Sequence, residues 1–250
     1  YAYNLFASFI PIFSLRRFIS SLTSSYLFRI ILGLTGIFSV KEQPTPLIDS
    51  YSETEDTIEP QQGDIIIANC ASYLNLFWLQ YKFSPIYVIP CDQTNAYIFN
   101  FYQLFASILS ERKLTSKLKK PLSEVIKIAS EKFKCPVVIF PEGSVTNGEF
   151  LINFMDFGKD IDTTKVHFHI LGFVHDKSYI SPNFVFGNGF LHLFSMSGRL
   201  FSKMKVKIAL PQDTKSLQKN IIDKEWIEKC RYIMSKITHL SLFDIDGNDF

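Results

Sequence analysis

The sequence predicts an α/β fold in which a mixed, mostly parallel central sheet is flanked by helices, with membrane-associated helices at the N-terminus. Short runs rich in Ile and Val alternate with segments of helical periodicity, and this alternation is typical of a sheet that helices cover on both faces. The chain has 250 residues, of which 47% are hydrophobic and 20% charged. That composition suffices for one globular domain with a buried core, and it excludes disorder over most of the chain.

The expected elements follow one another with short connections. Strands are expected at 64–68, 86–90, 136–140, 166–174 and 204–210, and helices at about 72–82, 95–108, 121–134 and 223–240. A loop is expected through Pro182 and 187–189. The helix at 121–134 has the clearest signal, because Pro121 suits a first turn and Ser123 is a candidate cap. Its predicted apolar face comprises Val125, Ile126, Ala129 and Phe133.

The first 40 residues form a region that we expect to contact a membrane. They contain Arg16, Arg17 and Arg29 but no acidic residue, and the apolar stretches 5–15 and 26–40 surround these arginines. Apolar stretches of this length that include a basic residue are typical of interfacial or re-entrant helices rather than of a single crossing. Amphipathic core helices and a cleaved signal peptide are the alternatives.

The segment 41–63 is expected to connect the N-terminal region 1–40 to the main domain, 64–250. It holds three prolines and many polar residues without a sustained period, although part of it could pair as an edge strand. Charge is segregated, since 49–59 is acidic whereas 111–120 has five basic residues and one acid. The basic run could hold a phosphate or anionic lipid, or it could be a solvated face.

Metal binding is not expected from the cysteines and histidines. The chain has four cysteines that form no C-x-x-C pair: Cys70, Cys91, Cys135 and Cys230. Their apolar surroundings are typical of buried, reduced thiols. His167 and His169 share one face of a predicted strand, but no third ligand accompanies them. We therefore interpret both as strand-surface or core histidines.

The segment 137–148, with the sequence VVIFPEGSVTNG, carries the strongest functional signal. Pro141 ends a buried strand, and Glu142 follows it directly, so the carboxylate is expected near the carboxyl end of that strand, where open α/β sheets bind ligands. Gly143 would let a ligand approach the backbone closely. The alternative is an ordinary exit from a strand, with Glu142 in solvent or capping.

A second strand, at 64–68, is followed by the polar turn Asn-Cys-Ala-Ser-Tyr-Leu-Asn at 69–75. If a helix begins near Ser72, the turn brings Cys70 and Asn75 together, in the places where a catalytic site would have a base and the acid that orients it. A thiol at a helix N-terminus can have a lowered pKa and become nucleophilic. The alternative is a small buried Cys70 beside an N-capping Ser72.

Together, these two loops resemble the lysophospholipid acyltransferase superfamily. Its members carry Asn-His-x-Ser-x-x-Asp after one strand and Phe-Pro-Glu-Gly-Thr-Arg-Ser after a later one, and this chain has Asn-Cys-Ala-Ser-Tyr-Leu-Asn at 69–75 and Phe-Pro-Glu-Gly-Ser-Val-Thr at 140–146. The continuation Thr-Asn-Gly at 146–148 is similar to the eukaryotic branch, and GNGFLHLF and MKVKIALP are similar to segments of fungal lysophosphatidate acyltransferases. The middle motif, usually Ile-Asp-Arg, is matched loosely by Ser-Glu-Arg at 110–112.

The resemblance implies transfer of a fatty acyl group from acyl-CoA, as co-substrate, to the hydroxyl of a lysophospholipid, without a metal or a bound cofactor. In the family a histidine acts as general base and an aspartate orients it; these positions are Cys70 and Asn75 here. Arg112 matches the phosphate-binding arginine. The acceptor-binding loop corresponds to Glu142, Gly143, Ser144, Thr146 and Asn147.

Two functions remain open. Because Cys70 and Asn75 replace the catalytic dyad and Val145 replaces an expected arginine, we expect an impaired or inactive enzyme with a lipid-binding or structural role in a membrane assembly. The alternative is an active acyl-CoA-dependent lysophosphatidate acyltransferase, with Cys70 as base or nucleophile, or with a remote histidine such as His167 as base. In either case the expected partners are membrane lipid or lysophospholipid and proteins of a membrane complex, but not nucleic acid. The expected location is an intracellular membrane, such as the endoplasmic reticulum or a lipid droplet.

Overall fold

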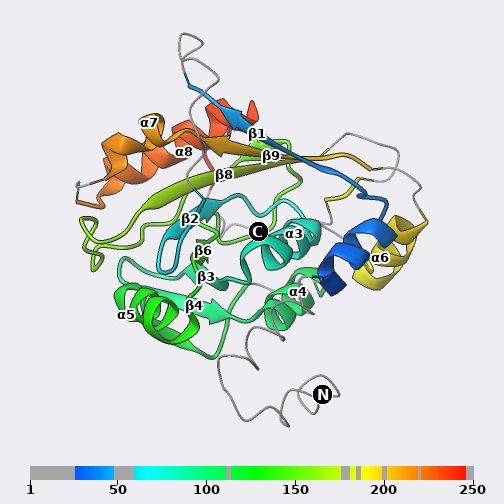
Figure 1. Cartoon of the computed structure of the whole chain (residues 1–250), viewed down its shortest axis with the longest axis horizontal. Coiled ribbons are helices and arrows are strands. Elements are labelled where there is room, and N and C mark those ends of the chain that lie inside the picture. Colours follow the sequence, from blue (N-terminus) through cyan, green and yellow to red (C-terminus); the bar gives the residue numbers. More distant parts are fainter. Residues whose placement is uncertain are drawn as a thin grey trace.

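The computed structural model describes residues 26–47, 59–110, 114–175, 181–183, 187–198, 202–218 and 221–245. Its centre is an eight-stranded sheet of order β1-β9-β8-β2-β6-β3-β4-β5 (Figure 1). The strands are β1 Val40–Thr45, β2 Ile65–Ala68, β3 Ile86–Pro90, β4 Asn95–Phe99, β5 Lys119–Pro121, β6 Val137–Ile139, β8 Phe168–His175 and β9 Met204–Ala209. The pairs β1–β9, β8–β2, β2–β6 and β6–β3 are parallel, and the remaining pairs of this sheet are antiparallel. The predicted mixed, mostly parallel sheet is confirmed.

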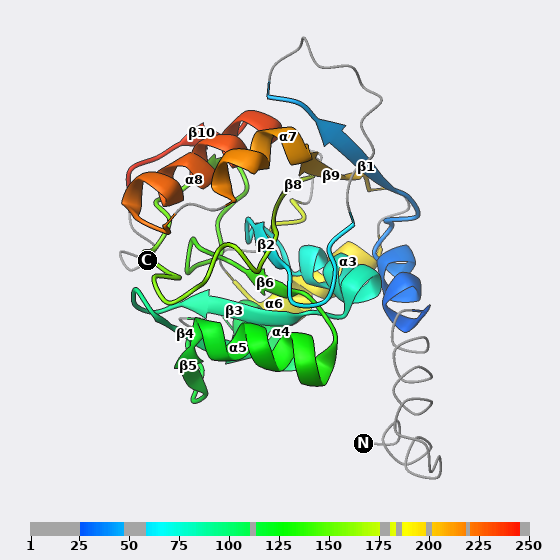
Figure 2. The same cartoon turned by 60° about the vertical axis from the view of Figure 1, so that its left-hand side comes forward.

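Helices cover both faces of the sheet (Figures 1 and 2). One face packs against the helical residues 26–34 and against α3 Tyr73–Phe83, α4 Phe101–Leu109 and α6 Gly189–Ser197. The other packs against α5 Leu122–Ile128, α7 Pro211–Thr214 and α8 Lys224–Thr238. A π-helical turn Ala129–Phe133 extends α5, a 3-10 turn Lys215–Leu217 follows α7, and the short strands β7 Phe150–Leu151 and β10 Ser241–Leu242 form a second sheet.

The strand β2 shows why the central strands are uninterrupted apolar runs. Ile65 and Ile67 lie in the core beneath α5 and α8, whereas Ile66 and Ala68 lie in the core beneath α3 and α4. Because successive side chains of a strand point to opposite faces, a strand that is covered on both sides needs an apolar residue at every position. The predicted strand at 64–68 is therefore confirmed by the packing on both of its faces.

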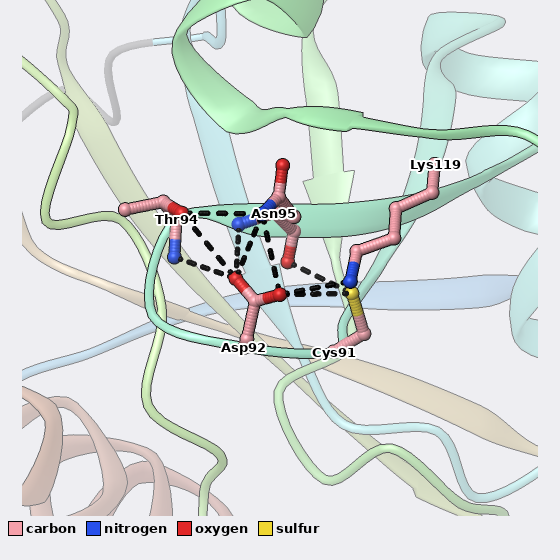
Figure 3. A network of polar contacts seen from close by, with 5 residues as sticks. All are labelled: Cys91, Asp92, Thr94, Asn95 and Lys119. Carbon is pink, nitrogen blue, oxygen red and sulfur yellow. Dashed lines mark hydrogen bonds and ion pairs between the residues drawn. The ribbon is translucent and has the colours of Figure 1, made fainter.

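The turn between β3 and β4 is held by the carboxylate of Asp92 (Figure 3). Its Oδ1 accepts the backbone N–H of Thr94 at 3.0 Å and that of Asn95 at 2.7 Å, and Nζ of Lys119 lies 2.9 Å from Oδ2. The hydrogen bond from Lys119 lowers the pKa of Asp92. An aspartate that binds the backbone two and three residues ahead favours a tight turn over a helix.

This turn corrects the helix predicted at 95–108. The first five residues of that segment form β4, which pairs antiparallel with β3, and α4 begins only at Phe101. Asn100 caps α4 in a reciprocal capping box, in which its side chain accepts the N–H of Gln103 and the Gln103 side chain accepts the N–H of Asn100. The helical spacing of the apolar residues extends across the boundary, so periodicity alone missed it.

The helix predicted at 121–134 is present with different ends. Pro121 is the N-cap residue of α5, and Ser123 lies inside the first turn, so Ser123 does not cap the helix. The N–H of Ser123 donates to Oδ2 of Asp160 at 2.9 Å. Phe133 was expected in the apolar face but is 43% exposed. The π-helical turn adds a residue to that turn and rotates Phe133 away from the buried side chains.

The ends of the described regions settle two further expectations. Val40–Thr45 pairs in parallel with β9, so part of the segment 41–63 is an edge strand. The loop predicted through 187–189 leads directly into α6, because the side chain of Asn188 caps that helix by accepting the N–H of Phe190 and of Leu191. The strands at 86–90, 136–140, 166–174 and 204–210 and the helices at 72–82 and 223–240 are confirmed to within a few residues.

Residues 1–25 lie outside the described residues, so the membrane-associated helices expected there stay a prediction, as does the division into 1–40, 41–63 and 64–250. Residues 26–34 are helical. Within this helix Arg29 donates from Nη1 to the carbonyl of Ile37 at 3.1 Å. Across the described ranges, every helix is too short or too polar to cross a bilayer.

One close contact fixes α8 against the sheet. A Cβ on Gly172 of β8 would overlap Cγ2 of Thr238 in α8. Thr238 cannot easily rotate away, because its Oγ1 donates to the carbonyl of Met234 at 2.6 Å. Only a glycine at position 172 lets the last turn of α8 reach the strand at this separation.

We predict that Gly172→Ala lowers the free energy of unfolding by about 1–3 kcal/mol, because an extra methyl group must displace a packed helix. Urea denaturation would measure the loss. Gly33→Ala is the matched control, since a Cβ at that position meets nothing within 4 Å. Equal stability of the two variants would contradict the tight packing of α8 on β8.

Candidate functional site

The two polar loops that were singled out in the sequence meet in the structure. The strands β2 and β6 are parallel neighbours, so the loops that follow them leave the same edge of the sheet. The N–H of Cys70 donates to Oε2 of Glu142 at 3.0 Å, and the N–H of Thr146 donates to the carbonyl of Cys70 at 3.1 Å. The predicted convergence of residues 69–75 and 140–148 is confirmed.

The side chain of Asn69 continues the pairing of β2 with β8 by two further hydrogen bonds. Its Oδ1 accepts the N–H of Phe173 at 2.7 Å, and its Nδ2 donates to the carbonyl of the same residue at 3.1 Å. The side chain thus satisfies both backbone groups of Phe173 in β8, where the ladder between β2 and β8 has just ended at Ala68 and Leu171. This pairing fixes the direction of the chain as it enters the turn.

The turn then starts α3 as the sequence predicts. Ser72 is the N-cap, and its Oγ accepts the N–H of Leu74 at 3.2 Å. The same hydroxyl donates to the carbonyl of Pro182 at 2.6 Å, which ties the helix start to residues 181–183. Both roles of Ser72 depend on a hydroxyl group, which can donate and accept at once.

Cys70 is completely buried at this point. Burial, together with the nearby carboxylate of Glu142, raises the pKa of the Cys70 thiol. The interpretation of Cys70 as a small buried cysteine beside an N-capping Ser72 is therefore confirmed. The alternative of a lowered pKa is wrong, because desolvation of the thiolate outweighs the helix dipole. A thiol that stays protonated at neutral pH is a weak nucleophile and no base.

Asn75 lies in the first turn of α3 and is also completely buried. Its Nδ2 donates to the carbonyl of Asn69 at 3.3 Å, and its Oδ1 is 2.7 Å from Nε2 of His175. His175 is the last residue of β8 and is half-buried. Sequence reasoning missed this histidine, although its position at the carboxyl end of a strand was a signal that could have found it.

The other two histidines near β8 lie elsewhere. His167 precedes the strand and is exposed, so it lies about 25 Å along the strand from His175 at a rise of about 3.3 Å per residue. Nε2 of His169 is 3.2 Å from Oδ2 of the buried Asp64, which makes it a satisfied core histidine. Within the described ranges, no group of three or more His, Cys, Asp or Glu side chains is placed to hold a metal.

Glu142 is a carboxylic acid with no exposed surface. Burial raises its pKa to about 7, against the opposing effects of the backbone N–H groups of Cys70 and Ile152 and the positive charge of Arg231. Arg231 comes from α8 and is itself buried, with Nη2 donating to the carbonyl of Phe243 at 2.8 Å. Sequence reasoning missed Arg231, because it lies within the apolar face of its helix.

The loop 140–148 needs glycine at two turns. Gly143 and Gly148 both have a φ of +69°, a conformation that glycine adopts without strain. A Cβ on Gly143 would lie 2.6 Å from Sδ of Met155, so the space that was expected for a ligand beside this glycine is filled by a side chain. At Gly148 the neighbouring group is the side-chain amide of Asn183, which donates to the carbonyl of Asn147.

The polar side chains of the loop divide into two kinds. Asn147 shapes the turn, since its Oδ1 accepts the N–H of Glu149 at 3.0 Å. The hydroxyl oxygens of Ser144 and Thr146, by contrast, are buried and have no hydrogen-bond partner among the described residues. Buried hydroxyl groups are nearly always paired in native proteins, so these two would take their partners from water or from a ligand.

A cavity of about 650 Å³ lies next to Met155, whose side chain packs on Gly143 of this loop. It extends from Cys91 and Asp92 in the β3–β4 turn to Met155, which packs on Gly143, and to Arg231. Its lining is mixed polar and apolar, and Cys91 is half-buried rather than buried as expected.

Arg112, the predicted phosphate-binding residue, lies outside the described residues, and its role stays a prediction. Three lysines of the same basic run are described, and the first of them, Lys117, is exposed. Lys119 pairs with Asp92 at 2.9 Å, and Lys120 pairs with Glu124 one helical turn away. These two lysines form surface ion pairs within the chain, which matches the alternative of a solvated charged face.

The chain is similar in sequence to a curated acyltransferase. No family model matches the chain. The chain is 30% identical over 158 residues to the putative lysophosphatidic acid:oleoyl-CoA acyltransferase of Schizosaccharomyces pombe. The matched segment covers 61% of this chain and 50% of the relative. This similarity confirms the resemblance to the lysophospholipid acyltransferase superfamily. The chain spans about half the length of this curated acyltransferase relative.

Among solved structures, the chain is similar to the crystal structure of the 1-acyl-sn-glycerophosphate (LPA) acyltransferase PlsC from Thermotoga maritima. The TM-score is 0.49 and the sequence identity 14%, over 94% of this chain and 84% of that chain.

We predict that Glu142→Gln flattens the dependence of stability on pH. In wild type the folded-state pKa of about 7 exceeds the ordinary value of 4.5, so the carboxyl group stabilises the fold below pH 4.5 and this contribution is lost as the pH rises through 7. The full loss is about 3 kcal/mol. Urea denaturation at pH 5 and pH 8 measures it, with Glu131→Gln, an exposed position on the π-helical turn, as control. The same pH slope in the Glu142 variant and wild type would contradict the burial of a titrating carboxyl group.

The burial of Cys70 predicts the order in which thiols react. In the folded protein, iodoacetamide should modify the half-buried Cys91 well before Cys70 or Cys230, both of which are completely buried and have a raised pKa. Mass spectrometry of peptides after timed labelling would give the order, and labelling in urea would remove it. Rapid labelling of Cys70 in the native state would contradict its burial and would identify the thiol as a reactive nucleophile.

Proposed function

We propose that this chain is a lysophosphatidate acyltransferase that transfers a fatty acyl group from acyl-CoA to the hydroxyl of lysophosphatidate at the junction of the loops 69–75 and 140–148. The observation that carries the proposal is the hydrogen bond of 3.0 Å between the N–H of Cys70 and Glu142. It joins the two loops that bear the acyltransferase motifs into one site, as such a reaction requires. The name of the Schizosaccharomyces pombe relative specifies the same acceptor and an acyl-CoA donor.

The loop 140–148 supplies the groups that suit the phosphate of the acceptor. The unpaired hydroxyls of Ser144 and Thr146 are donors that lie two positions apart in the chain, and a phosphate group accepts several such hydrogen bonds at once. In this role the two hydroxyls gain the partners that the described residues do not give them. Val145, which stands between them in place of the family's arginine, leaves more of the phosphate binding to these hydroxyls and to the predicted role of Arg112.

An inactive, lipid-binding protein is the second candidate function. The observation that favours it is the buried, neutral thiol of Cys70 at the position of the family's base. Against it stands a histidine, His175, that does contact Asn75 in the same site. The expectation of impaired catalysis depended on the replacement of both members of the dyad by Cys70 and Asn75, and His175 is a candidate base from outside the motif.

The protein is proposed to bind a membrane surface through an exposed apolar face near the site. Large apolar side chains project outward from the helical residues 26–34 and from α6: Tyr26, Leu27, Ile30, Leu34, Phe190, Leu191 and Phe194. The two helices both pack on α4, through Phe28 on Phe101 and through Gly189 on Leu109, and Figure 1 shows them side by side on the right. An apolar face of this kind suits the surface of a bilayer, where the lysophospholipid is dissolved. The organelle and any partner proteins stay predictions of the sequence.

Thr146→Val tests the phosphate-binding role of the loop. The valine keeps the shape and removes a hydroxyl that has no partner in the described protein, so stability should be equal or higher while the KM for lysophosphatidate rises about tenfold or more. Transfer of radiolabelled oleoyl groups from oleoyl-CoA, assayed with lysophosphatidate in mixed micelles, gives the KM. Thr214→Val is the matched control, because that buried hydroxyl already donates to the carbonyl of Pro211.

The same assay decides between the two functions. Transfer by wild type that persists in Cys70→Ala supports the proposal, with Cys70 as a packing residue. Transfer that disappears in Cys70→Ala, in a variant that still folds, would make the thiol catalytic. A wild-type protein that binds oleoyl-CoA but transfers nothing would overturn the proposal in favour of the lipid-binding role.

A further inference from the structure

The hydrogen bond between His175 and Asn75 places an imidazole in the candidate site by a route that the sequence motif does not contain. Asn75 Oδ1 is 2.7 Å from Nε2 of His175, whereas the two residues are 100 positions apart in the chain. We propose that His175 is the general base of the acyl transfer and that Asn75 orients it, so that the base has moved from the turn before helix α3 to strand β8. This inference rests on the proposed acyltransferase function.

The sheet fixes the backbone of His175 through β9, to which β8 runs antiparallel with His175 beside Met204. On the other side β8 runs parallel to β2, and their ladder ends at Leu171 beside Ala68. The carboxyl end of β8 therefore lies at the same edge of the sheet as the turn 69–75 and the loop 140–148. A side chain on a paired strand is held more precisely than one on an open loop, as a catalytic base requires.

The hydrogen-bond network also fixes the tautomer. Nδ2 of Asn75 donates to the carbonyl of Asn69 at 3.3 Å, which identifies the other amide atom, the one that faces His175, as the oxygen. An amide oxygen accepts hydrogen bonds only, so Nε2 of His175 carries the proton and the lone pair lies on Nδ1. An asparagine can hold a histidine in one tautomer in this way without any negative charge.

The proton balance of the reaction is complete with this base. Nδ1 of His175 takes the proton from the acceptor hydroxyl as its oxygen forms a bond to the thioester carbonyl carbon of acyl-CoA. The tetrahedral intermediate then breaks the carbon–sulfur bond, and the imidazolium returns the proton to the CoA sulfur. The products are the ester and CoA with a free thiol, and no oxidant, metal or acyl-enzyme takes part.

Variants of His175 can distinguish a general base from a residue that only supports the position of Asn75. His175→Gln keeps a side-chain N–H that can donate to Asn75 Oδ1 but cannot take up a proton, so it should fold and bind lysophosphatidate with an unchanged KM while kcat falls by a factor of about 10² to 10⁴. His175→Ala should lose the same activity and regain part of it when imidazole is added, because the free base can occupy the vacated space. His167→Gln, an exposed histidine before the same strand, should remain fully active.

The experiment measures kcat and KM for oleoyl transfer to lysophosphatidate by the full chain and these three variants, with thermal unfolding of each as a check on folding. A low kcat in His175→Gln with rescue of His175→Ala by imidazole supports the inference. Wild-type activity in a folded His175→Gln, or loss of activity without rescue by imidazole, overturns it and leaves the acyltransferase function standing. A wild type that transfers no acyl group removes both the function and the base.

Discussion

The carboxylate of Glu142 accepts the backbone N–H of Cys70 at a place from which water is excluded, and the relative position of the two site loops depends on this hydrogen bond. A buried carboxyl group is costly unless its oxygens are paired. The raised pKa of Glu142 reflects the cost of burying its charge, and the positive charge of Arg231 from α8 offsets part of that cost. The site is thus joined to the opposite face of the sheet, because the arginine that partly neutralises the loop belongs to the helix that packs on Gly172.

The fold could be predicted where the residue pattern had one interpretation. The apolar runs around Ile66 and Val138 are too short for helices and too apolar for surface strands, so a doubly covered parallel sheet was the natural solution. The segment 95–108 had two interpretations, and the outcome was decided by Asp92, whose hydrogen bonds turn the chain back as β4. The predicted burial of Phe133 was wrong for a related reason. Helical periodicity assumes an ideal α-helix, and one π-helical turn changes which residues face the core.

The candidate site was predictable to the extent that it is local in sequence. Cys70 and Glu142 lie just after the ends of two neighbouring strands, and the rule for parallel sheets predicts that they meet. The state of the Cys70 thiol was not predictable, since the helix N-terminus and burial act in opposite directions and only the structure gives the extent of burial. His175 is far from the motif in the chain, and its contact with Asn75 is a consequence of the register of β8 between β2 and β9.

The two outermost strands of the sheet have a common composition that affects the protein as a whole. β1 carries Lys41, Glu42 and Pro44, and β5 at the other border consists of Lys119, Lys120 and Pro121. An unpaired strand border is a template on which a second chain can extend the sheet, and lysine together with proline, which has no N–H to offer, removes that template. On the lipid surface that we propose for this protein, copies of the chain would meet at high local concentration. The prolines and charges at both borders should keep those encounters from growing into fibrils.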